Sequence, residues 1–152
     1  MDAEEIASIC QVKYQYFRHL DLKEFEQLGE LLTQDCAAGY DNGNLAFQGR
    51  AAIVEFLSTS LSDSGIISEH HGHHPEITME SPERARGVWY LEDRVLIPAA
   101  DLEISGTAFY EDQYVKLDGE WKIAKTGYIR VFEEQRSFAT RELKSFTSRF
   151  SA

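Results

Sequence analysis

Apolar residues change their spacing along this sequence, and the change constrains the fold more than any other feature. Up to about residue 60 they recur every three to four positions, which is typical of a helix with one buried face. From Glu69 onward they alternate with polar residues, as in strands that are buried on one side. Because the helices are grouped before the strands rather than alternating with them, the pattern predicts an α+β domain.

The first part of the chain predicts three helices. They are expected to cover the residues up to about 20, residues 23–32 and a segment around 53–57. Between the second and third helices, two short segments flank an Asp-Asn-Gly-Asn turn signal and are typical of strands, at 36–40 and 45–48.

The second part predicts four long strands. They lie near residues 69–80, 84–97, 102–117 and 121–132. The breaks between them carry the turn residues Pro, Asp and Gly, and each connection is short enough for a hairpin. We therefore expect a mostly antiparallel sheet.

A chain of 152 residues is expected to form one domain with a core large enough to hold a pocket. We place this domain at residues 1–135. Residues 136–152 form a basic tail in which Phe and Leu are interspersed with Arg and Lys, a pattern compatible with a helix. We expect the tail to dock on the domain.

The charge balance excludes several classes of partner. With 15 basic and 26 acidic residues the net charge is −11, which repels both a nucleic-acid backbone and an anionic membrane surface. No apolar run approaches the roughly 20 residues that cross a bilayer, and the acidic N-terminus lacks the pattern of an export signal. We expect a cytoplasmic protein that binds neither nucleic acid nor membrane.

Motifs for common cofactors are missing as well. The sequence has no phosphate-binding loop, dinucleotide fingerprint, serine-hydrolase elbow or zinc-protease motif, so no cofactor and no metal is expected. Cys10 and Cys36 stand outside any CxxC spacing, and we expect them to be reduced thiols in the core.

Four of the five histidines form the most informative cluster, at the start of the first long strand. Strand alternation predicts that His70 and His74 share one face while His71 and His73 share the other. Three hypotheses fit such a cluster: exposed histidines on a strand edge, a metal site made by imidazoles two positions apart, or a general base oriented by a buried carboxylate.

The third hypothesis needs a carboxylate, and Asp21 is the best candidate. It follows Leu20 directly, where the first helix ends on its apolar face. An Asp at this junction can also cap the second helix. The residues alone leave both roles open.

Several short motifs together resemble one known family. In chain order they are Tyr16-Phe-Arg-His-Leu-Asp21, Gly49-Arg-Ala-Ala-Ile53, His70-His-Gly-His-His-Pro-Glu-Ile77, Ala85-Arg-Gly-Val-Trp89 and Asp118-Gly-Glu-Trp-Lys-Ile123. Their order resembles the SnoaL-like family of the nuclear transport factor two-like superfamily, whose members include scytalone dehydratase, dehydrochlorinase, bile acid dehydratase and ketosteroid isomerase. The resemblance covers about residues 6–132 and implies a cone of three helices in a strongly curved, mostly antiparallel sheet around an apolar pocket.

The resemblance also implies roles for individual residues. The His and Asp pair of the dehydratases falls on His70 and Asp21, which implies a general base and the group that orients it. Tyr16 falls where relatives hydrogen-bond the carbonyl of the substrate, and Tyr40 falls on another tyrosine of the pocket. The pocket is further expected to be lined by Phe56, Trp89, Asp93, Tyr110 and Arg130. For Asp93 a structural ion pair with Arg94 or Arg130 is an equal alternative.

Two departures narrow the function. Val95 occupies a position near that of a catalytic His in scytalone dehydratase. Tyr40 occupies a position near that of the general-base Asp in ketosteroid isomerase. This sequence therefore lacks both of these catalytic groups at the matching positions. The resemblance then implies a cofactor-independent, dehydratase-like lyase that acts on a hydrophobic cyclic molecule such as a polyketide or steroid. A ketosteroid-type isomerase, a noncatalytic binding domain and a protein-interaction module remain alternatives.

The alternating strands carry apolar residues on their outer side as well. A patch of that kind exceeds what monomers usually expose, so we expect a homodimer or homotrimer.

Overall fold

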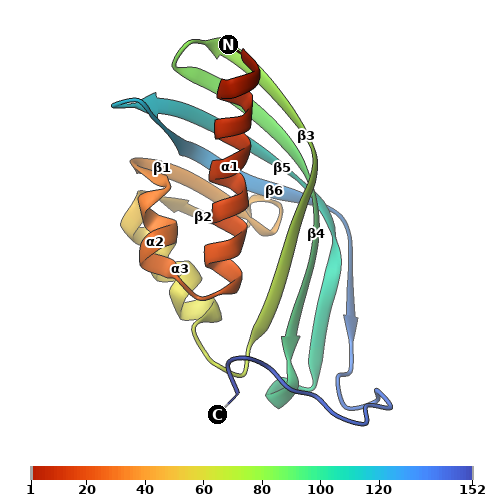
Figure 1. Ribbon diagram of the computed structural model, residues 1–152. Coiled ribbons are helices and arrows are strands. Elements are labelled where there is room, and N and C mark those ends of the chain that lie inside the picture. The colour runs from red at the N-terminus through yellow and green to blue at the C-terminus, as the bar shows by residue number, and fades with distance from the viewer. Residues whose placement is uncertain (1, 152) are drawn as a thin grey trace.

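A computed structural model describes residues 2–151 as one curved sheet with three helices on its concave side (Figure 1). The helices are α1 (Asp2–Asp21), α2 (Phe25–Glu30) and α3 (Arg50–Leu61). The strands are β1 (Leu32–Tyr40), β2 (Leu45–Gln48), β3 (Ile67–Ser81), β4 (Arg84–Ile97), β5 (Leu102–Leu117) and β6 (Glu120–Arg136), and two short 3-10 turns are η1 (Asp41–Gly43) and η2 (Pro98–Ala100). The α+β class and the helices-first order are confirmed.

The six strands form one mixed sheet in the order β2-β1-β6-β5-β4-β3. Strands β3 to β6 are successive antiparallel hairpins, as the turn residues predict, while β1 lies parallel to β6. The sheet wraps around α1 but is not closed, because β2 and β3 remain at its two edges (Figure 1). The expected cone is therefore open on one side.

Helix α1 lies in the hollow of the sheet and explains the spacing of its apolar residues. Ile9, Tyr16, Phe17 and Leu20 recur on one helix face, and each is at most 5 % exposed. Alternate residues of the long strands meet this face, so the helical and strand periods of the sequence bury a common core.

Two expected elements differ from the structure. The second helix ends at Glu30, because Leu32 opens β1 and pairs there with Ile123 of β6. The basic tail contains no helix within the described residues 137–151. It is held instead by polar contacts, since the Ser137 hydroxyl and the Ala139 amide donate to the carboxylate of Asp101.

The tail docks on the domain through a further ion pair, between Arg141 and the buried Glu103 of β5.

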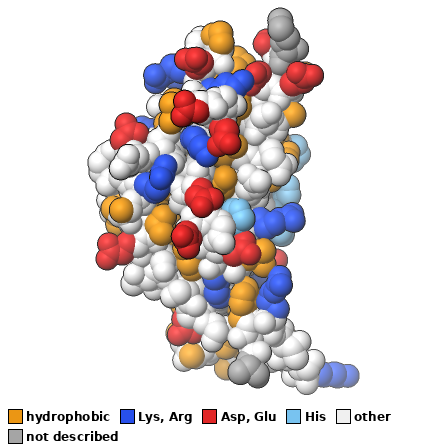
Figure 2. Space-filling view, turned by 60° about the vertical axis from the view of Figure 1, so that its left-hand side comes forward, with side chains coloured by type: hydrophobic (Ala, Val, Ile, Leu, Met, Phe, Trp, Pro, Cys, Tyr) orange, Lys and Arg blue, Asp and Glu red, His pale blue; other side chains and the backbone are white. Residues whose placement is uncertain are grey.

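Acidic and basic side chains are interspersed over the surface seen in Figure 2. Among the described helices, none has both the length and the apolar character that crossing a membrane requires.

Glycine at position 72 allows α1 to approach β3 closely. A Cβ atom built there would lie 2.4 Å from a ring carbon of Phe17 and 3.2 Å from Trp89. Because interiors are packed to near crystal density, these rings have little room to move. This close approach brings the end of α1 next to the histidines of β3.

We predict that Gly72→Ala destabilises the protein by about 1–3 kcal/mol, the usual cost of overpacking a core. The measurement is the free energy of unfolding in urea. Gly39→Ala is the matched control, because a Cβ at this strand glycine would have only one neighbour, at 3.8 Å. The double variant Phe17→Leu with Gly72→Ala should recover part of the loss, and equal stability of the two alanine variants would contradict the close-approach argument.

The convex face of the sheet exposes apolar side chains. Phe109 is 41 % exposed and lies opposite Ile129, which is 62 % exposed, and Tyr90 packs its ring against Phe109 at 4.6 Å. Monomers rarely leave such a contiguous surface open to water.

We propose that this face joins copies of the chain into a homo-oligomer. Light scattering of the protein at micromolar concentration should then give the mass of two or three chains of 17.3 kDa each. Ile129→Lys, on β6, should shift the mass to that of one chain. Leu117→Lys replaces another exposed apolar residue, at the end of β5, and should leave the mass unchanged. A wild-type mass of 17.3 kDa would refute the assembly.

Candidate active site

Asp21 and His70 are in direct contact. Asp21 is the last residue of α1, and its Oδ1 lies 2.7 Å from Nδ1 of His70 on β3. Its Oδ2 accepts the backbone amide of His70 at 2.8 Å, and the Ser68 hydroxyl donates to Oδ1 at 2.9 Å. Both carboxylate oxygens therefore hold β3, and the contact expected between the two residues is confirmed.

This contact assigns the two ring nitrogens of His70 different tasks. A carboxylate accepts a hydrogen bond, so Nδ1 is the nitrogen that donates to Asp21, and in the neutral form of the ring the lone pair is on Nε2. The Phe17 ring lies nearly parallel to the imidazole, with 6° between the planes and 6.2 Å between the centroids. His70 is thus fixed in both tautomer and orientation. Asp21 caps no helix here, since α2 begins without a side-chain cap.

His70 lines a cavity of about 240 Å³ that opens to solvent, between α1 and α3 on one side and the concave side of the sheet on the other. Its apolar wall consists of Leu20, Leu45, Phe56, Leu57, Leu61, Val95 and Ile104. The polar side chains among its lining residues are Tyr16, Tyr40, Asp41, Ser60, His70, Asp93, Tyr110, Tyr128, Arg130 and Glu133. Asp21 is not part of this wall and lies behind His70.

Two tyrosine hydroxyls meet inside the cavity. The oxygen atoms of Tyr16 and Tyr40 are 2.8 Å apart, so one hydroxyl donates to the other. Burial raises the pKa of both well above its ordinary value, and both stay protonated at neutral pH. The hydroxyls of Tyr110 and Tyr128 lie on the same wall, so the cavity offers a cluster of phenolic O–H groups to a ligand.

An ion pair forms another part of the wall. Both terminal nitrogens of Arg130 bind the carboxylate of Asp93, with Nη2 2.9 Å from Oδ2, and the guanidinium lies 5.0 Å from the ring centroid of Tyr128. The two alternatives stated for Asp93 are therefore compatible, because the paired carboxylate also lines the cavity.

A buried cation lies behind the tyrosines. Lys13 of α1 is inaccessible to solvent, and its Nζ lies 2.7 Å from Oδ2 of Asp112 and 3.6 Å from the ring centroid of Tyr110. Asp112 also accepts the hydroxyls of Tyr114 and Thr126, each at 2.7 Å. Burial lowers the pKa of Lys13, and the charge of Asp112 opposes this shift.

Lys13 can support chemistry from this position. Its Nζ also lies 4.7 Å from the ring centroid of Tyr16, and a cation over an aromatic face stabilises negative charge that builds up on the ring and its hydroxyl. The sequence analysis missed Lys13. The available signal was its place on the apolar face of α1, four residues after Ile9.

Most of the expected wall is present, but Trp89 is not part of it. Phe56, Tyr110 and Arg130 line the cavity as predicted. The indole of Trp89 is fully buried elsewhere in the core and donates from Nε1 to the Tyr114 hydroxyl at 3.0 Å. The expectation for Trp89 was wrong. The inward face of β4 is longer than the cavity, and only residues toward the C-terminal end of this strand line it.

The expected alternation of the histidines also fails at one position. A bulge in the pairing of β3 falls between His73 and Glu76, and His74 has a φ of 48°. His74 is consequently exposed and does not share the inner face with His70. His71 and His73 do lie on the outer side, as predicted.

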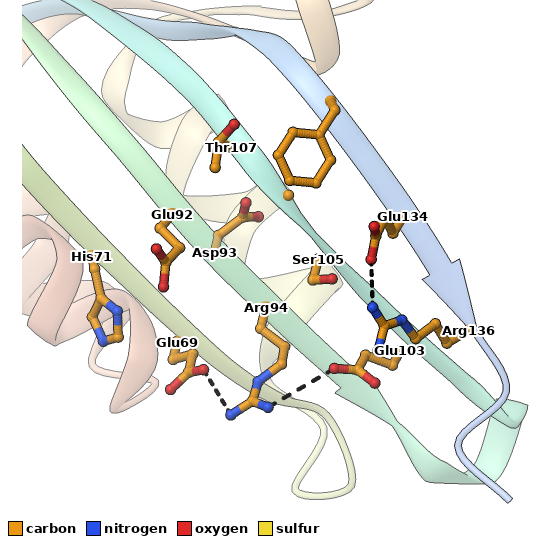
Figure 3. A pocket seen from close by; sticks show the side chains of 12 residues that line it. Glu69, His71, Glu92, Asp93, Arg94, Glu103, Ser105, Thr107, Glu134 and Arg136 are labelled. Carbon is orange, nitrogen blue, oxygen red and sulfur yellow. Dashed lines mark hydrogen bonds and ion pairs between the residues drawn. The ribbon is translucent and has the colours of Figure 1, made fainter. Parts of the chain in front are cut away.

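A larger hollow of about 480 Å³ lies on the outer side of the sheet (Figure 3). His71 reaches its edge, and charged pairs cross it, from Arg94 to Glu69 and Glu103. Arg136 pairs with Glu134 on the same surface, whereas the Thr107 hydroxyl is buried without a hydrogen-bond partner. Within residues 2–151 no three His, Cys, Asp or Glu side chains are placed to hold a metal ion, and both cysteines are free and buried as expected.

Comparison with known proteins identifies the family. A model of the SnoaL-like domain matches residues 1–127. The chain belongs to the SnoaL-like family. The match spans α1 to the first part of β6, and it includes the groups described above except Tyr128, Arg130 and Glu133, which lie beyond residue 127.

Solved structures share the SnoaL-like fold. A provisionally assigned scytalone dehydratase from Novosphingobium aromaticivorans is 22% identical with a TM-score of 0.81, covering 88% of this chain and 88% of that chain. A type 2 hexachlorocyclohexane dehydrochlorinase is 14% identical with a TM-score of 0.81, covering 95% and 97%. ActVI-ORFA from Streptomyces coelicolor is 17% identical with a TM-score of 0.72, covering 84% and 98%.

The buried ion pair of this SnoaL-like domain makes a stability prediction. Lys13→Met leaves the Asp112 carboxylate buried without its cation and should cost about 3–5 kcal/mol in urea unfolding. The double variant Lys13→Met with Asp112→Leu should recover much of this loss, because it removes both charges. Lys116→Met, which breaks the partly exposed pair with Glu5, should cost clearly less. A loss for Lys13→Met no larger than for Lys116→Met would disprove the proposed dependence on this pair.

Proposed function

We propose that the protein is a cofactor-independent lyase of the dehydratase type. The observation that carries this proposal is that an oriented base and an oxyanion donor line the same cavity. Nδ1 of His70 is fixed by Asp21 at 2.7 Å, and the same cavity holds the hydroxyl pair of Tyr16 and Tyr40. An elimination next to a carbonyl needs these two groups.

The proposed reaction starts with proton removal. Nε2 of His70 takes a proton from the carbon next to a carbonyl, and a tyrosine O–H of the cavity stabilises the oxyanion that forms. The electron pair then forms the carbon–carbon double bond as the bond to the leaving hydroxyl breaks. The proton held by His70 passes to the departing oxygen, so that water leaves and the base is restored.

Asp21 and Lys13 act through other residues in this scheme. Asp21 keeps Nδ1 protonated and balances the charge of the imidazolium that forms when Nε2 accepts a proton. Lys13 offsets the negative charge that moves toward Tyr16 as its hydroxyl pair binds the oxyanion.

Two observations favour elimination over isomerisation. The fold is shared with proteins named as a dehydratase and a dehydrochlorinase, and both names denote eliminations. A ketosteroid-type isomerase needs a free carboxylate base facing Tyr16. The best-buried carboxylate on the wall, that of Asp93, has both oxygens bound by Arg130.

The test uses a cyclic β-hydroxy ketone, β-hydroxy-α-tetralone, which gives α-naphthol on loss of water. His70→Ala and Asp21→Asn should each lower the rate by roughly 10²–10⁴-fold, and the double variant should lose little more, because the two residues act as one unit. Tyr16→Phe should cost on the order of 10²-fold through the lost hydroxyl. The appearance of the naphthol absorbance measures each rate.

His73→Ala is the matched control, since this histidine lies on the outer side of the same strand. Exchange of the α-protons of β-tetralone in D₂O isolates the proton-transfer step without a leaving group. Full turnover by His70→Ala would overturn the role of the base. A wild-type protein that binds these ketones but neither dehydrates them nor exchanges their protons would belong to the noncatalytic binders.

A further inference from the structure

We propose that a surface groove behind the pair of Asp21 and His70 is a binding site for a phosphate group. The groove measures about 560 Å³ and lies between α1 and the free edge of β3, with Arg149 of the tail also on its wall. His70 separates it from the cavity described above, because this residue lines both spaces. The groove is a second site, and it does not depend on the lyase activity proposed for the first.

The charge of the groove is opposite to that of the chain. The net charge of the chain is −11, yet among the described residues that line the groove Arg18 and Arg149 outnumber the single acid, Asp21. Both oxygens of Asp21 already accept hydrogen bonds from β3, at 2.7 Å and 2.8 Å from His70. An anion that enters the groove therefore meets net positive charge.

The two arginines of the groove lack partners of their own. Within residues 2–151 neither guanidinium forms a hydrogen bond or an ion pair. By contrast, Arg94, Arg130 and Arg141 each bind a carboxylate of the chain. In a chain with 26 acidic and 15 basic residues, two such guanidinium groups in one groove indicate a place for an external anion. Arginine suits phosphate in particular, because its planar group donates paired N–H bonds to phosphate oxygens.

Arg149 is brought to the groove by the docked end of the tail. The next residue, Phe150, has its ring centroid 4.9 Å from Nζ of Lys23. Lys23 lies two residues beyond the end of α1, and its Nζ also donates to the backbone oxygens of Leu61 and Ile66, the latter at 2.6 Å. The end of the tail is thus anchored beside the last turn of α1, where the groove lies.

The free edge of β3 adds a backbone donor. The N–H of His70 points away from β4, since it donates to Asp21. Backbone groups alternate between the two sides of an antiparallel strand, so the N–H of Gly72 points to the same free edge. Gly72 lines the groove, and so does His71, whose ring carries an N–H in either protonation state. A phosphate group has oxygens in several directions, which matches donors that come from α1, β3 and the tail.

The test is an NMR titration of the whole ¹⁵N-labelled chain with inorganic phosphate and with phenyl phosphate, at constant ionic strength. We expect both probes to shift the amide signal of Gly72 and the Nε–H signals of Arg18 and Arg149. The dissociation constant of the tighter probe should be about 1 mM or lower. Tighter binding of phenyl phosphate would assign the site to a phosphate ester, and equal binding would assign it to the free ion.

Arg18→Gln and Arg149→Gln should each weaken phosphate binding about fivefold or more, because each removes a charge-assisted hydrogen bond. Lys144→Gln is the matched control. It removes the same charge from an exposed position of the tail that does not line the groove, and it should change the affinity less than about twofold. Urea unfolding of the three variants should give the wild-type stability, since all three side chains are exposed.

Three results would overturn the site. The first is a response to sodium chloride that equals the response to phosphate, because this would reduce the effect to screening. The second is equal affinity in Arg18→Gln, Arg149→Gln and Lys144→Gln. The third is a set of shifts confined to cavity residues such as Tyr16 and Phe56. None of these results bears on the proposed lyase, whose test uses ketones that carry no phosphate.

Discussion

The buried ion pair between Lys13 and Asp112 fixes the position of α1 inside the sheet, and the site depends on that position. Removing two charges from water is costly, so such a pair persists only with good geometry and further hydrogen bonds. Here Asp112 binds Lys13, Tyr114 and Thr126, which ties α1 to β5 and β6 at one depth. Tyr16 follows about one helical turn later on α1, and Asp21 ends the helix beside β3.

The sequence predicted the architecture well because burial follows the spacing of apolar residues, and this spacing can be recognised within short stretches of the sequence. The apolar period placed α1 and the four hairpin strands close to their observed bounds. It failed where one residue can serve either element: Leu32 continues the helical stripe of α2, yet pairing with Ile123 places it in β1. It also failed for the tail, whose conformation is set by contacts with Asp101 and Glu103 that only the folded sheet brings near.

The candidate site was predicted in part, for a related reason. The position of Asp21 where the first helix ends made it a candidate carboxylate, but its pairing with His70 was implied by the family resemblance. Trp89 was misplaced because the alternation in a strand predicts on which face of the sheet a residue lies. It does not predict how far the cavity extends along that strand. Lys13 was missed because its burial makes sense only with Asp112, a partner that lies far along the chain.

Several polar groups of the cavity bind one another in the absence of a ligand. The tyrosine hydroxyls bind each other, Arg130 binds Asp93, and the inner nitrogen of His70 binds Asp21. Among the described residues of the wall, Nε of Arg130 is buried without a hydrogen-bond partner. In the proposed reaction, a substrate that binds His70 and the tyrosine hydroxyls need not break these ion pairs, and it meets groups whose orientation the protein has already fixed, which is the arrangement that stabilises a transition state without reorganisation.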